Sequence, residues 1–129
     1  KSAQLARAAA DEFSTPEKPR WVGGSMGPGT KFATLGNISY EDLRASYYPS
    51  ALGLLEGGVD LFVIETQFDL LGAKAAMAAC RDAMAEVGRE VPIQVQVTIE
   101  LTGRMLPGTE ISAALVALDA MGTDVIGIN

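Results

Sequence analysis

The residue of this sequence best placed to do chemistry is Glu65, a carboxylate that directly follows an apolar, strand-forming run at Leu61–Ile64. Such a run is typical of a parallel strand that is covered on both faces. Open α/β sheets and α/β barrels place their active sites at the carboxyl ends of these strands. A charge so close to a core strand needs a partner, either amides and cations of the protein or the ammonium group of a ligand. The position of Glu65 favours the ligand.

A second segment repeats this pattern at the end of the sequence. Both segments read Gly, one residue, Asp, an apolar run and a polar residue, and the second finishes on Asn129. Asp60 and Asp124 therefore stand at the opposite strand ends, where we expect turn residues. Asp69 is expected to cap a helix. Polar or small residues end every expected strand, as they would if all the following loops met at one mouth: Ser25, Glu65, Thr98 with Glu100, and Asn129.

Helices and strands are expected to alternate along the whole sequence. Ser39 with Asp42 resembles a capping box, Thr109 is expected to be an N-cap, and Pro49 predicts a kink or a short break. The expected helices run from Lys1 to about Phe13, Ser39 to about Glu56, Leu70 to Val87 and Thr109 to Met121; the expected strands begin at Trp21, end at Glu65, and span Val91–Thr98 and Asp124–Asn129.

This alternation implies right-handed crossovers and a parallel sheet. Four strands can belong to an open doubly wound sheet or to half of an eight-stranded barrel. The polar strand ends favour the barrel, as does the lack of a tight Gly-rich turn leading straight from a strand into a helix. We therefore predict an α/β fold, a partial (β/α)8 TIM barrel of about four parallel strands with intervening helices.

Composition narrows the classes of function. The 129 residues carry a formal charge of −6 without a Lys/Arg cluster, which argues against a nucleic-acid partner. The apolar runs are too short to span a membrane, and no secretion signal is present, so we expect a cytoplasmic protein. The absence of His removes Ser-His and Cys-His catalysis from within this chain. Its one cysteine, Cys80, lies on an apolar helical stripe and is expected to be buried, and it cannot form a zinc site alone.

The glycine-rich segment Gly23–Lys31 could suggest a phosphate-binding loop. It lacks the Gly-Lys-Ser/Thr ending of a P-loop, and about ten residues separate it from the next helix. A loop that forms part of a pocket wall is the favoured interpretation.

Several segments together resemble the homocysteine-binding domain of cobalamin-dependent methionine synthases. The resemblance extends over essentially the whole chain and is carried by Gly24–Lys31, Thr34–Gly36, Leu54–Asp60, Val63–Thr66, Asp69–Leu70, Thr98–Glu100, Thr102–Gly108 and Asp124–Asn129. It implies a (β/α)8 barrel that binds zinc through three cysteines, the first of which directly follows a strand-end Gly-x-Asn. The sequence stops at Asn129, so the resemblance places these ligands beyond it. Residues 1–129 are thus expected to be the central fragment of one such barrel domain, with no catalytic residue of their own.

The resemblance also implies a mechanism and a set of partners. Zinc would strip the proton from the thiol of homocysteine, and the thiolate would attack a methyl group on the cobalt of cobalamin to form methionine. Glu65 would bind the homocysteine ammonium group, and Thr66 would belong to the same substrate site. Asn129 would orient the substrate or the adjoining zinc ligand, and Ser25 would line the barrel mouth. The partners would be homocysteine and the cobalamin-carrying and folate-binding domains of a parent protein.

Other interpretations remain open on the sequence. Betaine-type and other homocysteine methyltransferases share the surroundings of Glu65, so the methyl donor is less well defined than the acceptor. A different TIM-barrel or doubly wound enzyme, binding a pterin or a sugar phosphate, is a second possibility. The third is a structural barrel fragment that has no activity alone, because half a barrel exposes unpaired strand edges.

Overall fold

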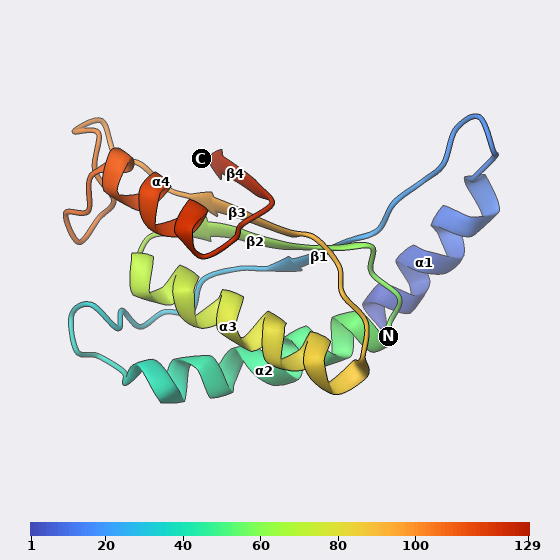
Figure 1. Ribbon diagram of the computed structural model, residues 1–129, viewed down its shortest axis with the longest axis horizontal. Helices are drawn as coiled ribbons and strands as arrows, with labels where there is room; N and C mark the ends of the chain where they lie inside the picture. The colour runs from blue at the N-terminus through green and yellow to red at the C-terminus, as the bar shows by residue number, and fades with distance from the viewer.

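The computed structural model describes residues 1–129, in which four helices and four strands alternate (Figure 1). The predicted order of elements is confirmed. The helices are α1 (Ser2–Phe13), α2 (Tyr40–Glu56), α3 (Leu70–Val87) and α4 (Ile111–Ala120), and the strands are β1 (Gly23–Met26), β2 (Leu61–Gln67), β3 (Ile93–Val97) and β4 (Val125–Ile128). None of the four helices combines the length and the apolar character that a membrane-spanning segment requires.

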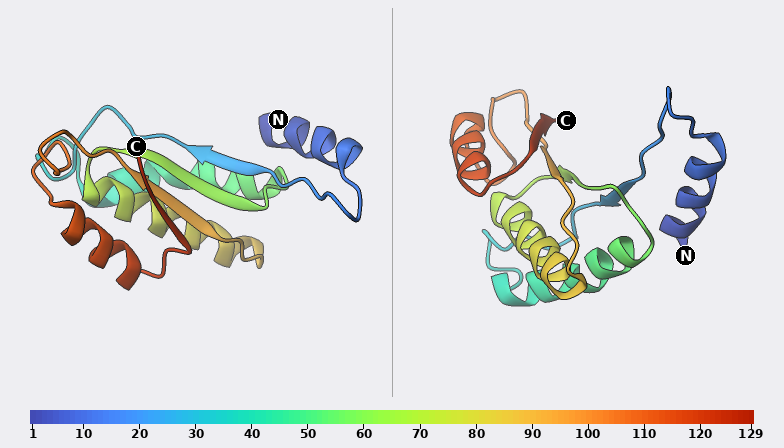
Figure 2. Two further views of the ribbon diagram at one scale, coloured as in Figure 1. Left: turned by 90° about the horizontal axis from the view of Figure 1, so that it is seen from above. Right: turned by 45° about the vertical axis from the view of Figure 1, so that its right-hand side comes forward.

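The strands form one parallel sheet in the order β1-β2-β3-β4. A doubly wound sheet reverses its strand order at a switch point, whereas a barrel adds each new strand beside the last. The sequential order therefore confirms the predicted partial barrel. Helices α2 and α3 lie against one face of the sheet, and the other face is left uncovered (Figure 2).

The core forms between the sheet and α3, because alternate strand residues point toward the helices. Phe62 and Ile64 of β2 and Val95 of β3 are fully buried, as is Met77 of α3. The residues between them, such as Ser25, Val63, Gln94 and Gln96, face away from the helices and are only partly buried or exposed. These intervening residues define the open face of the sheet, which in a closed barrel is the interior.

Helix boundaries follow the sequence in part. Ser39 Oγ accepts a hydrogen bond of 3.0 Å from the N–H of Asp42, as the capping box predicts. The expectation of a break at Pro49 is wrong, because α2 continues through it with Tyr47 and Ala51 held in the core on either side. The prediction of Thr109 as an N-cap is also wrong. Glu110 is the N-cap of α4, since the backbone carbonyl of Thr109 is engaged in a turn by the N–H of Met105 at 2.8 Å.

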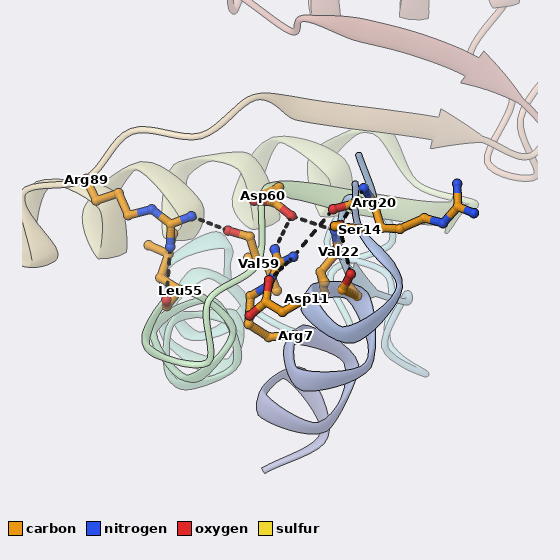
Figure 3. Close-up of polar contacts among 10 residues, drawn as sticks. Arg7, Asp11, Ser14, Arg20, Val22, Leu55, Val59, Asp60 and Arg89 are labelled. Carbon is orange, nitrogen blue, oxygen red and sulfur yellow. Dashed lines mark hydrogen bonds and ion pairs between the residues drawn. The ribbon is translucent and has the colours of Figure 1, made fainter. Parts of the chain in front are cut away.

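Asp60 and Asp124 tie neighbouring strands together at their amino ends (Figure 3 shows Asp60). Each lies in a bend, as predicted, and each also makes two hydrogen bonds to one residue of the strand beside it. The Asp60 carboxylate accepts from the N–H of Val22 at 2.6 Å, and its own N–H donates to the Val22 carbonyl at 2.7 Å. Asp124 repeats the arrangement with Ile93, at 2.8 Å and 3.0 Å. Asp60 additionally forms an ion pair of 2.6 Å with Arg7, which attaches α1 to this end of the sheet.

Candidate functional site

A bulge shapes the carboxyl end of β2. The strands β2 and β3 pair regularly up to Ile64 and Val95, and pairing resumes at Gln67 and Val97, so β2 carries one extra residue in between. Thr66 lies in this stretch with a φ of 58°, and it is the one residue other than glycine with a positive φ. A β-branched residue in this region is strained, and such strain clusters at functional sites. A bulge of this kind re-aims side chains at the end of a strand.

Glu65, the central residue of the sequence prediction, lies in this bulge and contacts Ser25 of β1. The Ser25 hydroxyl donates a hydrogen bond to a Glu65 carboxylate oxygen. Glu65 is half-buried, and no Lys or Arg side chain forms an ion pair with it. Because Ser25 lies on the open face, the carboxylate points to that face as well. The structure thus brings two of the four predicted site residues together, and no cation of the protein is paired with the Glu65 carboxylate.

The other two predicted residues form a second pair. Asn129 Nδ2 donates a hydrogen bond of 2.9 Å to Thr66 Oγ1. Asn129 follows β4 and Thr66 belongs to β2, so this Thr66–Asn129 bridge crosses the end of β3, which lies between them. All four predicted residues consequently meet at the carboxyl ends of the strands, on the open face.

The loop between β1 and α2 is fixed beside this site by Asp69. Asp69 Oδ1 accepts from the N–H of Leu71 at 3.2 Å, which confirms the predicted helix cap of α3. The same carboxylate accepts from the N–H of Thr34 at 3.0 Å and from the Thr34 hydroxyl. The rings of Phe32 and Phe68 also meet, with centroids 6.4 Å apart. These contacts attach the part of the loop that follows the glycine-rich segment to the start of α3. That the glycine-rich segment itself forms part of a pocket wall stays a prediction.

Sequence reasoning missed the contact of Thr34 with Asp69. An Asp that precedes a helix is visible in the sequence, but no fixed spacing along the chain indicates that it pairs with a Thr in the loop between β1 and α2. Glu100, the other polar residue after β3, is exposed and makes no side-chain hydrogen bond with the four site residues.

The chain offers no group of three His, Cys, Asp or Glu side chains that could hold a metal ion. Cys80 is fully buried in α3, as predicted, and its thiol lies 3.6 Å from the sulfur of Met26. Burial raises the pKa of this thiol from 9.0 to about 12, against a smaller lowering by Arg81. A thiol of this kind is protonated at neutral pH and does not serve as a metal ligand or a nucleophile.

A hollow of about 820 Å³ lies away from these residues. It is lined by the carboxyl half of α3 and the segment that enters β3, with Arg81, Met84 and Asp124 among its residues. None of the four site residues lines it. The candidate site is thus an exposed cluster on the open face rather than a closed pocket within these residues.

Fold and site together define a segment of an α/β barrel whose strand ends carry a cluster of polar side chains. The family model described as homocysteine S-methyltransferase matches residues 1–129. The chain therefore belongs to the homocysteine S-methyltransferase family, in agreement with the resemblance seen in its sequence. This membership favours the homocysteine interpretation over a pterin- or sugar-phosphate-binding enzyme.

Two relatives are similar over nearly the whole chain. The methionine synthase of Mycobacterium leprae is 52% identical over 125 residues, which are 97% of this chain and 10% of that protein. The methionine synthase of Mycobacterium tuberculosis is 49% identical over 129 residues, which are 100% of this chain and 11% of that protein. The chain thus spans about a tenth of the length of these relatives.

One solved structure shares the fold. The crystal structure of the homocysteine methyltransferase MmuM from Escherichia coli, in its apo form, matches with a TM-score of 0.77 at 23% sequence identity. The match covers 99% of this chain and 46% of that one. This likeness supports the arrangement of helices and strands.

Proposed function

We propose that residues 1–129 are the central part of a (β/α)8 homocysteine-binding domain, in a methyltransferase that methylates homocysteine to methionine. Family membership and the two methionine synthase relatives support this assignment. The observation that carries it is the half-buried Glu65 carboxylate, aimed at the open face with a hydroxyl as its side-chain partner.

Glu65 would bind the ammonium group of homocysteine. A partly desolvated carboxylate is costly unless a cation approaches it, and an amino-acid ammonium group supplies that cation. Ser25 holds one carboxylate oxygen in place and leaves the other for the substrate. Thr66 and Asn129 would form the adjoining wall of the site, on the side of β4.

Zinc and methylcobalamin are the expected cofactors of the parent protein, with zinc activating the thiol and methylcobalamin donating the methyl group. The side chains of this chain do not fit a zinc site, since the only cysteine is buried in the core and no acidic cluster replaces it. We derive no reaction step through either group. The proposal assigns to this chain the binding and orientation of the amino acid, next to cobalamin-carrying and folate-binding domains in a cytoplasmic protein.

The test is homocysteine binding, measured by calorimetry on the complete domain in its parent protein. Glu65→Gln removes the charge and keeps the shape, so the loss of a charge-assisted hydrogen bond should weaken binding about 10- to 100-fold. The zinc content should not change. Glu100→Gln is the matched control, because Glu100 also follows a strand but is exposed and makes no side-chain hydrogen bond or ion pair with the cluster. Equal affinities of the wild type and Glu65→Gln would refute the ammonium assignment.

A further inference from the structure

Thr66 combines an unfavourable backbone conformation with a position in the candidate site. Its φ of 58° lies in the left-handed region, where every other residue with a positive φ is a glycine. A threonine is strained there, because its branched side chain crowds the neighbouring backbone. Glycine would adopt the same conformation without strain, so the presence of a threonine suggests that its side chain has a role of its own.

The bulge places Thr66 at the site instead of in the core. Phe62 and Ile64 point toward the helices, and regular alternation would turn Thr66 to the same face. Because β2 carries one extra residue, Gln67 takes that buried position and is only 1% exposed. Gln67 Nε2 donates a hydrogen bond of 3.4 Å to the carbonyl of Glu65, across Thr66. The left-handed turn is thus what brings the Thr66 side chain to the open face.

The Thr66 hydroxyl contacts Asn129, whose backbone is already fixed. Asn129 Nδ2 donates to Thr66 Oγ1 at 2.9 Å. The N–H of Asn129 donates to the Val97 carbonyl at 2.9 Å, and its carbonyl accepts from the N–H of Ile99 at 3.5 Å. With the backbone held by these two bonds, the freedom that remains to Asn129 is rotation of its side chain. The bond to Thr66 removes that freedom.

Fixing the amide also decides which of its atoms is offered to a ligand. Because Nδ2 is engaged by Thr66, the carboxamide oxygen Oδ1 of the exposed Asn129 is the atom left free. Such an oxygen accepts hydrogen bonds, and homocysteine carries donors in its ammonium and thiol groups. An amide that rotated freely would present either atom, and ordering it would reduce the affinity.

We propose that Thr66 is a positioning residue, whose hydroxyl holds the Asn129 carboxamide in the orientation that homocysteine binding uses. The strained backbone keeps the hydroxyl at the place where Asn129 can reach it. This inference rests on the proposed function, because it takes homocysteine as the ligand of the site. Thr66 acts on the substrate through Asn129, which makes the direct contact.

The experiment measures L-homocysteine binding to variants of the parent protein by calorimetry. Thr66→Val keeps the shape and removes the hydroxyl, whereas Thr66→Gly removes the hydroxyl and the strain together. Both should weaken binding about 3- to 10-fold, which corresponds to one hydrogen bond. Thr66→Ser keeps the hydroxyl and should bind within about twofold of the wild type. Thr102→Val is the matched control, because Thr102 is an exposed threonine in the loop after β3, and this change should leave the affinity unaltered.

Two further measurements separate positioning from a structural role. Thr66→Gly should leave the thermal unfolding midpoint unchanged or higher while the affinity falls, because glycine adopts a φ of 58° without strain. Asn129→Ala should weaken binding at least as much as Thr66→Val does. Adding Thr66→Val to Asn129→Ala should change the affinity by less than about twofold, since the group that Thr66 positions is already gone.

Three results would overturn the inference. Wild-type affinity in Thr66→Val and Thr66→Gly would show that binding does not need the hydroxyl. Additive losses from Thr66→Val and Asn129→Ala would show that Thr66 does not act through Asn129. A lower unfolding midpoint in Thr66→Gly would show that the threonine side chain serves the stability of the fold.

Glu65→Gln distinguishes a failure of this inference from a failure of the proposed function. If Glu65→Gln weakens L-homocysteine binding and Thr66→Val does not, only the positioning role fails. If Thr66→Val weakens binding and Glu65→Gln does not, the ammonium assignment fails and the positioning role stands. If L-homocysteine does not bind the wild-type parent protein, both fail.

Discussion

The Asp69 carboxylate accepts hydrogen bonds from three donors in two separate segments of the chain. Replacing Asp69 therefore tests how strongly the loop between β1 and α2 is attached to the start of α3. One donor is the N–H of Leu71 at the start of α3, and the other two are the N–H and hydroxyl groups of Thr34. A lost N-cap costs about 1 kcal/mol. Each bond from Thr34 to the charged carboxylate contributes about 1.5 kcal/mol, the lower end of its range, because Thr34 is exposed. Asp69→Ala should therefore destabilise this part of the domain by about 4 kcal/mol.

Asp69→Ser separates the cap from the loop contact. Serine caps helices well but is too short to reach Thr34, so this variant should retain about 1 kcal/mol relative to Asp69→Ala. Thr34→Val alone removes the hydroxyl bond and should cost about 1.5 kcal/mol. In the presence of Asp69→Ser it should cost almost nothing, because its acceptor is already gone.

Native-state hydrogen exchange in the parent protein measures these differences locally, from peptides that cover Phe32–Asn37 and the first turn of α3. Faster exchange should appear in both segments for Asp69→Ala, and mainly in the loop for Asp69→Ser. Additive effects of Thr34→Val and Asp69→Ser would show that the Thr34 hydroxyl does not depend on Asp69, and the reasoning would fail.

Two further predictions concern the core and the amino ends of the strands. Asp124→Ala should leave the buried N–H of Ile93 without its acceptor and lower the free energy of unfolding in urea by about 1–3 kcal/mol. A loss below about 0.5 kcal/mol, the usual size of a surface substitution's effect, would contradict this role. Because burial raises the pKa of Cys80 from 9.0 to about 12, the stability that this thiol contributes is complete below pH 9 and falls as pH rises toward 12. Cys80→Ala should flatten this decline of the unfolding free energy with pH. Iodoacetamide at pH 8.5, which is about the pKa of a free thiol, should modify Cys80 only after the protein unfolds. Ready modification of the folded protein would contradict the burial of this thiol.

The sequence was sufficient for the order of elements, because apolar periodicity and capping residues act over a few positions. Ser39 and Asp69 cap the helices that they precede, and Glu65 stands at the end of its strand as expected. These features depend on the nearest neighbours along the chain, which the sequence displays directly.

The details of the site depend on strand pairing and could not be obtained in this way. The bulge at Thr66 is defined by where Gln67 pairs with β3, and nothing in the local sequence requires a β-branched residue with positive φ. The Thr66–Asn129 bridge joins residues 63 positions apart across an intervening strand. The choice of Glu110 over Thr109 as an N-cap likewise follows from a turn closed by Met105.

The paired hydrogen bonds of Asp60 and Asp124 have a consequence for the fidelity of folding. A parallel sheet assembles from segments that are distant along the chain, and a one-residue slip would turn every side chain of a strand to the wrong face. Such a slip would also move Asp60 about 3.3 Å along β1, away from both the N–H and the carbonyl of Val22. Each aspartate therefore penalises a misaligned pair of strands while the sheet is forming, and Asp60 selects the alignment of β1 with β2 in which Ser25 can reach Glu65.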